Sequence, residues 1–207
     1  MSKELIYRRF SKLERFVKKA SDDSQKWSVE NGAIISGDVA LDQNDDNRIE
    51  ALSCSVNDIV VVYGFGTGKT IESILDRYKK AIVISIETIP EILKVAVEHN
   101  DEVLLNSQFF IAAGDTEEIK EQIDAYLSIF ANRMVWGDLR QLTLKGYSEP
   151  HFPLSELQSY LNKSIAPVIV NRNTLILSSE KISNNYIKTA PKIADSSSVL
   201  ELKDRFK

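Results

Sequence analysis

The sequence contains little of what disulfide-rich, zinc-binding or membrane proteins require. Cys54 is the only cysteine in 207 residues, which excludes an internal disulfide and a cysteine-based zinc cluster. No apolar run approaches the roughly 18 residues of a membrane-spanning helix, and the N-terminus lacks the apolar core of a secretion signal. We therefore expect a cytoplasmic protein without a transmembrane segment.

Positive charge is not in excess either. The formal net charge of −4 argues against a general nucleic-acid binder, so no nucleic-acid partner is expected. With 43% hydrophobic and 27% charged residues, the composition is that of a globular protein. The length is sufficient for one core, or for a domain with an appendage.

The stretch from residue 58 to residue 87 has the pattern of a β-α-β unit. Ile59–Tyr63 is short, β-branched and aromatic, which is typical of a strand buried on both faces. Gly64, Gly66 and Gly68 follow, and they allow a sharp turn into a helix without Cβ clashes. The apolar positions of that helix recur at helical spacing and are Ile71, Ile74, Leu75 and Tyr78.

A second predicted strand, Ile82–Ile86, ends on Glu87, which lies 21 residues beyond Gly66. In nucleotide-binding folds the glycine turn lies against phosphate, and an acid at about this distance accepts a hydrogen bond from a ribose hydroxyl. Gly64, Gly66, Gly68 and Glu87 are therefore candidate cofactor-binding residues. The alternative stays open, because a glycine turn also forms where a strand and a helix simply pack closely.

A third predicted strand, residues 109–113, ends before Gly114 and Asp115. A carboxylate at that edge of the sheet is placed to bind a base amine, so Asp115 joins the candidate cofactor-binding residues. Asp115 is also a suitable N-cap for a helix over residues 117–130, and this interpretation is favoured. Right-handed crossovers predict the strand order 3-2-1.

The glycine stretch matches each well-known nucleotide motif only in part. A P-loop would need glycine where Tyr63 stands, and the dinucleotide fingerprint would need its third glycine at Lys69. The Gly-x-Gly-x-Gly of S-adenosylmethionine-dependent methyltransferases fits, although their usual acid is replaced by Val62. A nucleotide sugar or a molecule resembling S-adenosylmethionine is therefore the candidate ligand, and no metal site is predicted.

The remaining segments flank this unit. Residues 3–20 predict one basic amphipathic helix that packs on the domain or on a second copy, and Asn31-Gly32 predicts a hairpin. Thr88–Glu91 has the form of a capping box. A short strand is expected over 134–136, a helix over 155–163, an apolar segment at 168–170 and a polar helical tail after it. These elements predict an N-terminal helix and β-hairpin appendage (1–45), a Rossmann-like parallel α/β domain flanked by helices (46–165), and a helical tail with a linker toward a further domain (166–207).

From about residue 45 onward the chain resembles one family, the N-terminal domain of the bacterial motility accessory factors. These flagellin glycosyltransferases carry a domain related to 6-hydroxymethylpterin pyrophosphokinase. The resemblance depends on six segments: Val60–Gly68, Ile82–Glu87, Pro90-Glu91-Ile92, Asn171–Thr174, Asn184-Asn185-Tyr186 and Leu200–Lys207. The chain departs from the family at Thr67, Lys69 and Thr88. Family members commonly have leucine and an aromatic residue in place of Thr67 and Lys69, and proline in place of Thr88.

The resemblance implies a non-catalytic module that recognises the acceptor or positions the transferase domain. Its partners would be a transferase domain downstream in the same protein, and flagellin or another acceptor protein. Asp58 and the residues of the glycine turn would mark the Rossmann-like turn, and catalytic residues have no counterpart here. Two other functions stay open: a small-molecule methyltransferase that uses S-adenosylmethionine, and a nucleotide triphosphatase, which Tyr63 disfavours.

Overall fold

The computed structural model describes residues 2–20, 28–30, 33–36, 39–41, 46–99, 101–149 and 152–194. The chain divides into two compact units, Met1–Ala166 and Pro167–Lys207. A single helix, α9 (Leu154–Ala194), contributes to both units. The first unit contains every described strand, which places the predicted nucleotide-type turn within it.

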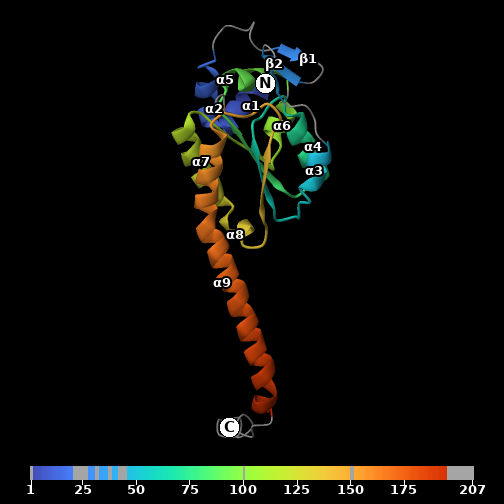
Figure 1. Ribbon diagram of the computed structural model, residues 1–207, viewed down its shortest axis with the longest axis vertical. Coiled ribbons are helices and arrows are strands. Elements are labelled where there is room, and N and C mark those ends of the chain that lie inside the picture. The colour runs from blue at the N-terminus through green and yellow to red at the C-terminus, as the bar shows by residue number, and fades with distance from the viewer. Residues whose placement is uncertain are drawn as a thin grey trace. The chain divides into compact units, whose positions relative to one another are not determined.

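The centre of the first unit is a four-stranded parallel sheet with the order β6-β5-β4-β7. Figure 1 shows this sheet among the helices of the unit. Its strands are β4 (Ile59–Tyr63), β5 (Ile82–Glu87), β6 (Phe109–Ala113) and β7 (Leu139–Thr143). Val61 lies opposite Ile84 in β5, and Ile84 lies opposite Phe110 in β6. The predicted parallel pairing and the predicted order of the first three strands are confirmed. The fold is α/β and Rossmann-like.

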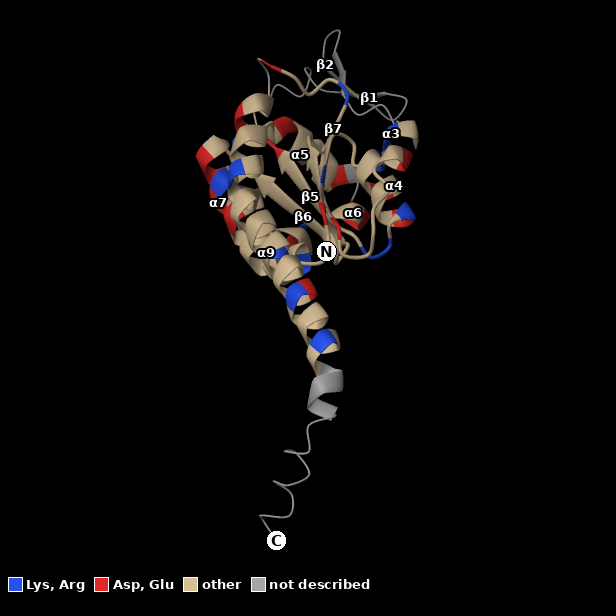
Figure 2. Ribbon diagram, turned by 60° about the horizontal axis from the view of Figure 1, so that its bottom comes forward, with Lys and Arg blue, Asp and Glu red and all other residues tan. Residues whose placement is uncertain are grey.

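Helices flank this sheet and connect its strands. They are α4 (Lys69–Arg77), α5 (Pro90–His99), α6 (Asp101–Leu105), α7 (Thr116–Ile129) and α8 (Ala131–Met134). β4 and β6 carry no charged residue, whereas charged residues gather on the surrounding helices (Figure 2). This separation buries the β-branched strand residues on both faces, as expected for a parallel sheet between helices.

The predicted strand at 134–136 is wrong. Met134 ends the helix α8, and the fourth strand begins five residues later, at Leu139. Asp58 explains how this strand joins the sheet, because its carboxylate accepts hydrogen bonds from the backbone N–H of Asp138 (2.9 Å) and from Arg140 Nε (3.4 Å). A buried acid at the amino end of β4 thus aligns a polar edge strand that its own sequence does not announce.

The predicted basic helix over residues 3–20 is two helices, α1 (Ser2–Arg9) and α2 (Ser11–Val17). The chain bends at Phe10, which has φ −119° and ψ 79°. The Phe10 ring packs edge-on against Phe109 of β6, with a centroid distance of 6.4 Å. Packing on the sheet therefore interrupts the helical periodicity, and α1 and α2 lie against α5, α6 and β6 of the same domain.

A small antiparallel sheet contains β1 (Ser28–Glu30), β2 (Ala33–Ser36) and β3 (Val39–Leu41). Glu30 pairs with Ala33, which confirms the predicted hairpin strands, while Asn31-Gly32 lies outside the described residues. The third strand was not predicted. A helix, α3 (Asp46–Ala51), leads from this sheet to β4.

The last helix, α9, is continuous over 41 residues. The predicted break between a helix at 155–163 and an apolar segment at 168–170 is therefore wrong. Leu157, Leu161 and Ile165 are buried in the first unit. Within the described part of the chain, no helix is both long and apolar enough to cross a membrane.

Candidate functional site

The topological switch point of the sheet lies between β4 and β7, because β5 and β6 extend from β4 in one direction and β7 lies on its other side. Rossmann-type folds bind their ligands at this point, outside the carboxyl ends of the strands. Here the chain turns through Gly64, Gly66 and Gly68, whose φ angles are +99°, +57° and +82°. Only glycine adopts these angles at little cost, so three glycines are required to lead β4 into α4.

Glu87 lies beside this turn, as the spacing of the sequence predicts, but its carboxylate faces the protein. Its side chain is fully buried, and each oxygen accepts two hydrogen bonds. Oε2 accepts from the backbone N–H of Phe65 (2.9 Å) and from the Tyr147 hydroxyl (2.7 Å). Oε1 accepts from the backbone N–H groups of Thr88 and Ile89, both at 2.9 Å. A ribose hydroxyl would have to displace one of these donors.

The same contacts replace the predicted capping box at Thr88–Glu91. The Thr88 hydroxyl has no hydrogen-bond partner in the part of the chain that the structure describes. The Glu87 carboxylate instead accepts from the two N–H groups that precede Pro90, where α5 begins. The N-terminal end of α5 is thus stabilised by the residue that the sequence analysis assigns to a ribose.

Tyr147 occupies the space over the glycine turn. Its ring lies so close to Gly64 that a Cβ at this glycine would be 2.5 Å from the ring. Its hydroxyl accepts a hydrogen bond from the backbone N–H of Gly66 (3.0 Å) while donating to Glu87. Gly64, Phe65, Gly66, Glu87 and Tyr147 together form what we call the switch-point cluster.

Four N–H groups of the glycine turn donate to acceptors within the protein. Those of Phe65 and Gly66 donate to the switch-point cluster, that of Gly64 donates to the Ile86 carbonyl at 2.8 Å, and that of Gly68 donates to the Phe65 carbonyl at 3.0 Å. Phosphate binding at such turns depends on N–H groups that point at the ligand. These four point at protein acceptors.

Burial raises the pKa of the Glu87 carboxyl group to about 7, although the hydrogen bonds from Phe65, Tyr147, Ile89 and Thr88 favour the charged form. Near neutral pH the Glu87 carboxyl group is therefore partly protonated. A perturbed carboxyl group is typical of active sites, but it is also produced by structural burial. The four hydrogen bonds that the Glu87 carboxylate accepts all come from the protein itself. We therefore assign its raised pKa to structural burial rather than to catalysis.

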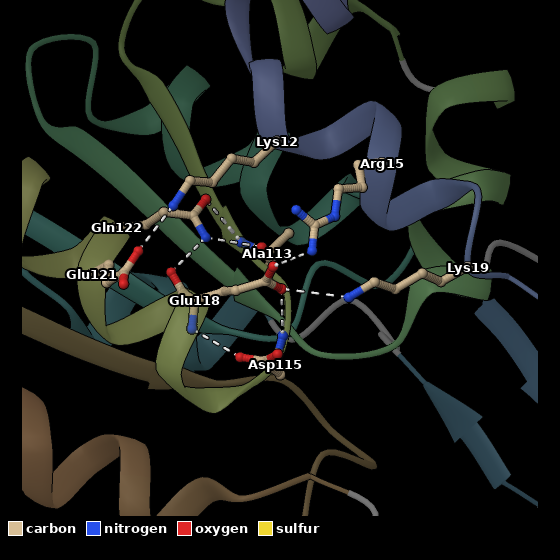
Figure 3. A network of polar contacts seen from close by, with 8 residues as sticks. All are labelled: Lys12, Arg15, Lys19, Ala113, Asp115, Glu118, Glu121 and Gln122. Carbon is tan, nitrogen blue, oxygen red and sulfur yellow. Dashed lines mark hydrogen bonds and ion pairs between the residues drawn. The ribbon is translucent and has the colours of Figure 1, made fainter.

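Asp115 follows the edge strand β6 and caps α7 (Figure 3). Its side chain accepts from the Glu118 N–H (2.9 Å), and Glu118 accepts from the Asp115 N–H (3.2 Å). Glu118 also forms ion pairs with Arg15 and Lys19 at 3.5 and 3.6 Å. The capping role favoured by the sequence is confirmed, and the structure does not bring Asp115 into contact with Glu87.

A cleft of about 300 Å³ lies beside this cap and is lined by residues of α2, β6 and α7, among them Lys12, Phe16 and Glu121. The Lys12 ammonium pairs with Glu121 across it at 3.1 Å. Both side chains are more than half exposed, so the pair adds little stability. Basic and acidic side chains line this cleft in similar number, so it offers a ligand no predominantly positive or negative surface.

One residue that the sequence singles out does not lie at the switch point. Asp58 precedes β4 and lies at the opposite end of the strand from the glycine turn. Among the residues that the structure describes, no group of three or more His, Cys, Asp or Glu could hold a metal ion.

Sequence reasoning missed Tyr147, which completes the cluster from 60 residues beyond Glu87. It lies four residues beyond the end of β7, so recognising Leu139–Thr143 as a strand would have placed it near the carboxyl edge of the sheet.

Comparison of the chain with family models, curated proteins and solved structures finds no match. The geometry alone therefore carries the functional argument, and the family resemblance stays a prediction.

Proposed function

We propose that this chain is a Rossmann-like module that performs no chemistry itself and that recognises or positions proteins. The switch-point cluster carries this proposal, because Tyr147 and Glu87 occupy the place where a nucleotide-type ligand would lie. A domain whose ligand position is filled by its own side chains keeps the fold and its surfaces, but it has lost the open site.

The resemblance to motility accessory factors supplies the setting for this proposal. In that setting the module belongs to a protein glycosyltransferase that transfers nonulosonic acids from cytidine-nucleotide sugars to flagellin. Its partners are then a transferase domain downstream in the same polypeptide and the acceptor protein. The module contributes recognition of the acceptor or the placement of the transferase, while the transferase domain provides catalysis.

The rival function, a methyltransferase that uses S-adenosylmethionine, needs an accessible carboxylate at Glu87 and free space over Gly64. The 2.7 Å hydrogen bond between Tyr147 and Glu87 would have to break, and the ring would have to leave Gly64. Leaving buried donors without acceptors costs roughly 1–3 kcal/mol each, which a ligand would have to repay. The closed cluster therefore favours the module over the enzyme.

A thermal-shift panel tests the proposal. The purified chain is heated with S-adenosylmethionine, cytidine nucleotides, dinucleotides or magnesium-ATP, and a methyltransferase assayed beside it shows that the ligands are active. A ligand bound by the folded state raises Tm, whereas we expect no rise with any of these. The isolated chain is also expected to transfer no sugar to flagellin. A rise with S-adenosylmethionine that is lost in Glu87→Gln would instead establish the methyltransferase, and sugar transfer by the chain alone would refute a non-catalytic module.

A further inference from the structure

The second unit exposes apolar side chains that a helix in water normally buries. In α9, beyond Ala166, every described side chain up to Thr189 is exposed except Val168 and Arg172, which are half-buried. Leu175, Ile182 and Tyr186 are 58%, 69% and 70% exposed. Most helices in proteins are stabilised by packing an apolar face, and contiguous exposed apolar surface marks an interaction site.

Six positions of this helix, four of them apolar, form two interleaved series with a seven-residue period. Val168, Leu175 and Ile182 make up the first series, and Arg172, Ser179 and Tyr186 the second, displaced by four residues. Spacings of three and four residues in alternation are the signature of a seam between paired helices. We call these six positions the α9 seam. Ile169, Ile176 and Ile187 border it at helical spacing.

We infer that the α9 seam binds a second copy of this chain, with the two helices antiparallel. The inference concerns the second unit alone and does not depend on the proposed function. A second copy is the partner that the seam itself specifies, because its residues complement one another when the helix is turned end to end about a two-fold axis. Such a self-complementary patch is the rule in two-fold dimers.

The pairing of residues decides the direction. With the axis passing between Glu180 and Lys181, Leu175 faces Tyr186 of the second copy. In the same register Ser179 faces Ile182 of the second copy, so each small serine meets a large isoleucine. Arg172 then faces Thr189 of the second copy. In this antiparallel register neither serine faces the other serine, and no like charges meet in the seam.

A parallel pair of α9 helices would fit less well in both side-chain size and charge. Identical residues face each other in a parallel two-fold pair, so Arg172 would meet Arg172 and Ser179 would meet Ser179. The first contact brings two positive charges together in the seam, and the second leaves a gap.

The size of the surface is sufficient. Six apolar residues of the seam and its border are between 39% and 70% exposed: Ile169, Leu175, Ile176, Ile182, Tyr186 and Ile187. If these residues lose about 80 Å² each on average on both copies, the interface covers about 1,000 Å², where specific interfaces begin.

Sedimentation analysis of the full chain over a micromolar concentration series tests the surface. We expect a dimer, with twice the monomer mass of 23.4 kDa. Ile182→Glu is expected to raise the dissociation constant at least about 100-fold, because the two-fold axis places the buried charge in the interface twice. Leu177→Glu is the matched control, since Leu177 is 59% exposed but points to the opposite side of the helix. Circular dichroism establishes that each variant is folded, and Ile176→Glu, at the border of the seam, serves as a second interface variant.

Cysteine cross-linking tests the direction in a Cys54→Ala background. Leu175→Cys mixed with Tyr186→Cys is expected to give a disulfide-linked heterodimer, whereas neither variant cross-links to itself. A monomeric wild type, or a dimer that Leu177→Glu weakens as much as Ile182→Glu, would overturn the surface. Efficient self-cross-linking of Leu175→Cys would overturn the antiparallel direction.

Discussion

Replacing Glu87 with alanine is expected to lower the free energy of unfolding by about 4 kcal/mol. The substitution removes the acceptor of the buried Phe65 N–H and Tyr147 hydroxyl and of the half-buried N–H groups of Thr88 and Ile89. Each unsatisfied buried donor costs roughly 1–3 kcal/mol, and water entering the vacated space recovers part of the sum. Urea unfolding followed by circular dichroism at pH 7 measures the change.

Glu87→Gln is the matched control for this prediction. The amide keeps the shape of the side chain and one acceptor oxygen, but its NH2 group faces a backbone donor. We expect it to cost about 1–2 kcal/mol, clearly less than alanine. If Glu87→Ala were as stable as the wild type, the carboxylate would not hold the glycine turn and the N-terminal end of α5 together.

Replacing Gly64 with alanine is expected to cost about 4 kcal/mol, and most of this cost should vanish when Tyr147 is also replaced by alanine. The φ angle of +99° by itself strains an alanine by about 1–2 kcal/mol. The rest arises because the new Cβ would lie 2.5 Å from the Tyr147 ring, which two hydrogen bonds hold in place.

A double-mutant cycle isolates this contact. In the Tyr147→Ala background, Gly64→Ala should cost only the backbone strain, so the coupling between the two substitutions should be about 2–3 kcal/mol. Gly146→Ala is the control for strain, because Gly146 is exposed and has a φ of +86°. Additive costs at Gly64 and Tyr147 would mean that the ring does not occupy the space over the glycine turn.

The sequence predicts the centre of this fold well, because the first three parallel strands are buried on both faces. Ile59–Tyr63 and Phe109–Ala113 are apolar throughout, and the glycines between strand and helix fix where the first crossover begins. The position of Glu87 beside those glycines follows from the same pattern, since carboxyl ends of parallel strands meet at one edge.

The polar parts of the fold could not be predicted in this way. Leu139–Thr143 contains Arg140 and Gln141, so its pattern does not announce a strand, and Asp58 aligns it through contacts more than 75 residues away in sequence. The break at Phe10 depends on a ring contact with Phe109. Local periodicity carries no information about such long-range contacts.

The absence of long-range information also explains the two interpretations of Glu87. The sequence indicates a ligand-binding residue, whereas the fold shows a structural one. Its spacing from Gly66 is that of a ribose-binding acid, and the sequence gives no sign of the tyrosine that reaches it from beyond β7. The chain therefore has the residue spacing of a nucleotide-binding motif, but the groups expected to hydrogen-bond to a ligand bond to other groups of the protein.

Hydrogen exchange at the amide of Gly66, measured by NMR on the wild-type chain, tests this claim most directly. Because this N–H donates to a hydroxyl group inside the switch-point cluster, we expect it to exchange as slowly as the amide of Val61 in the central strand, through global unfolding only. Exchange of Gly66 many orders of magnitude faster than that of Val61 would show that the position over the glycine turn is open to solvent, and hence to a ligand.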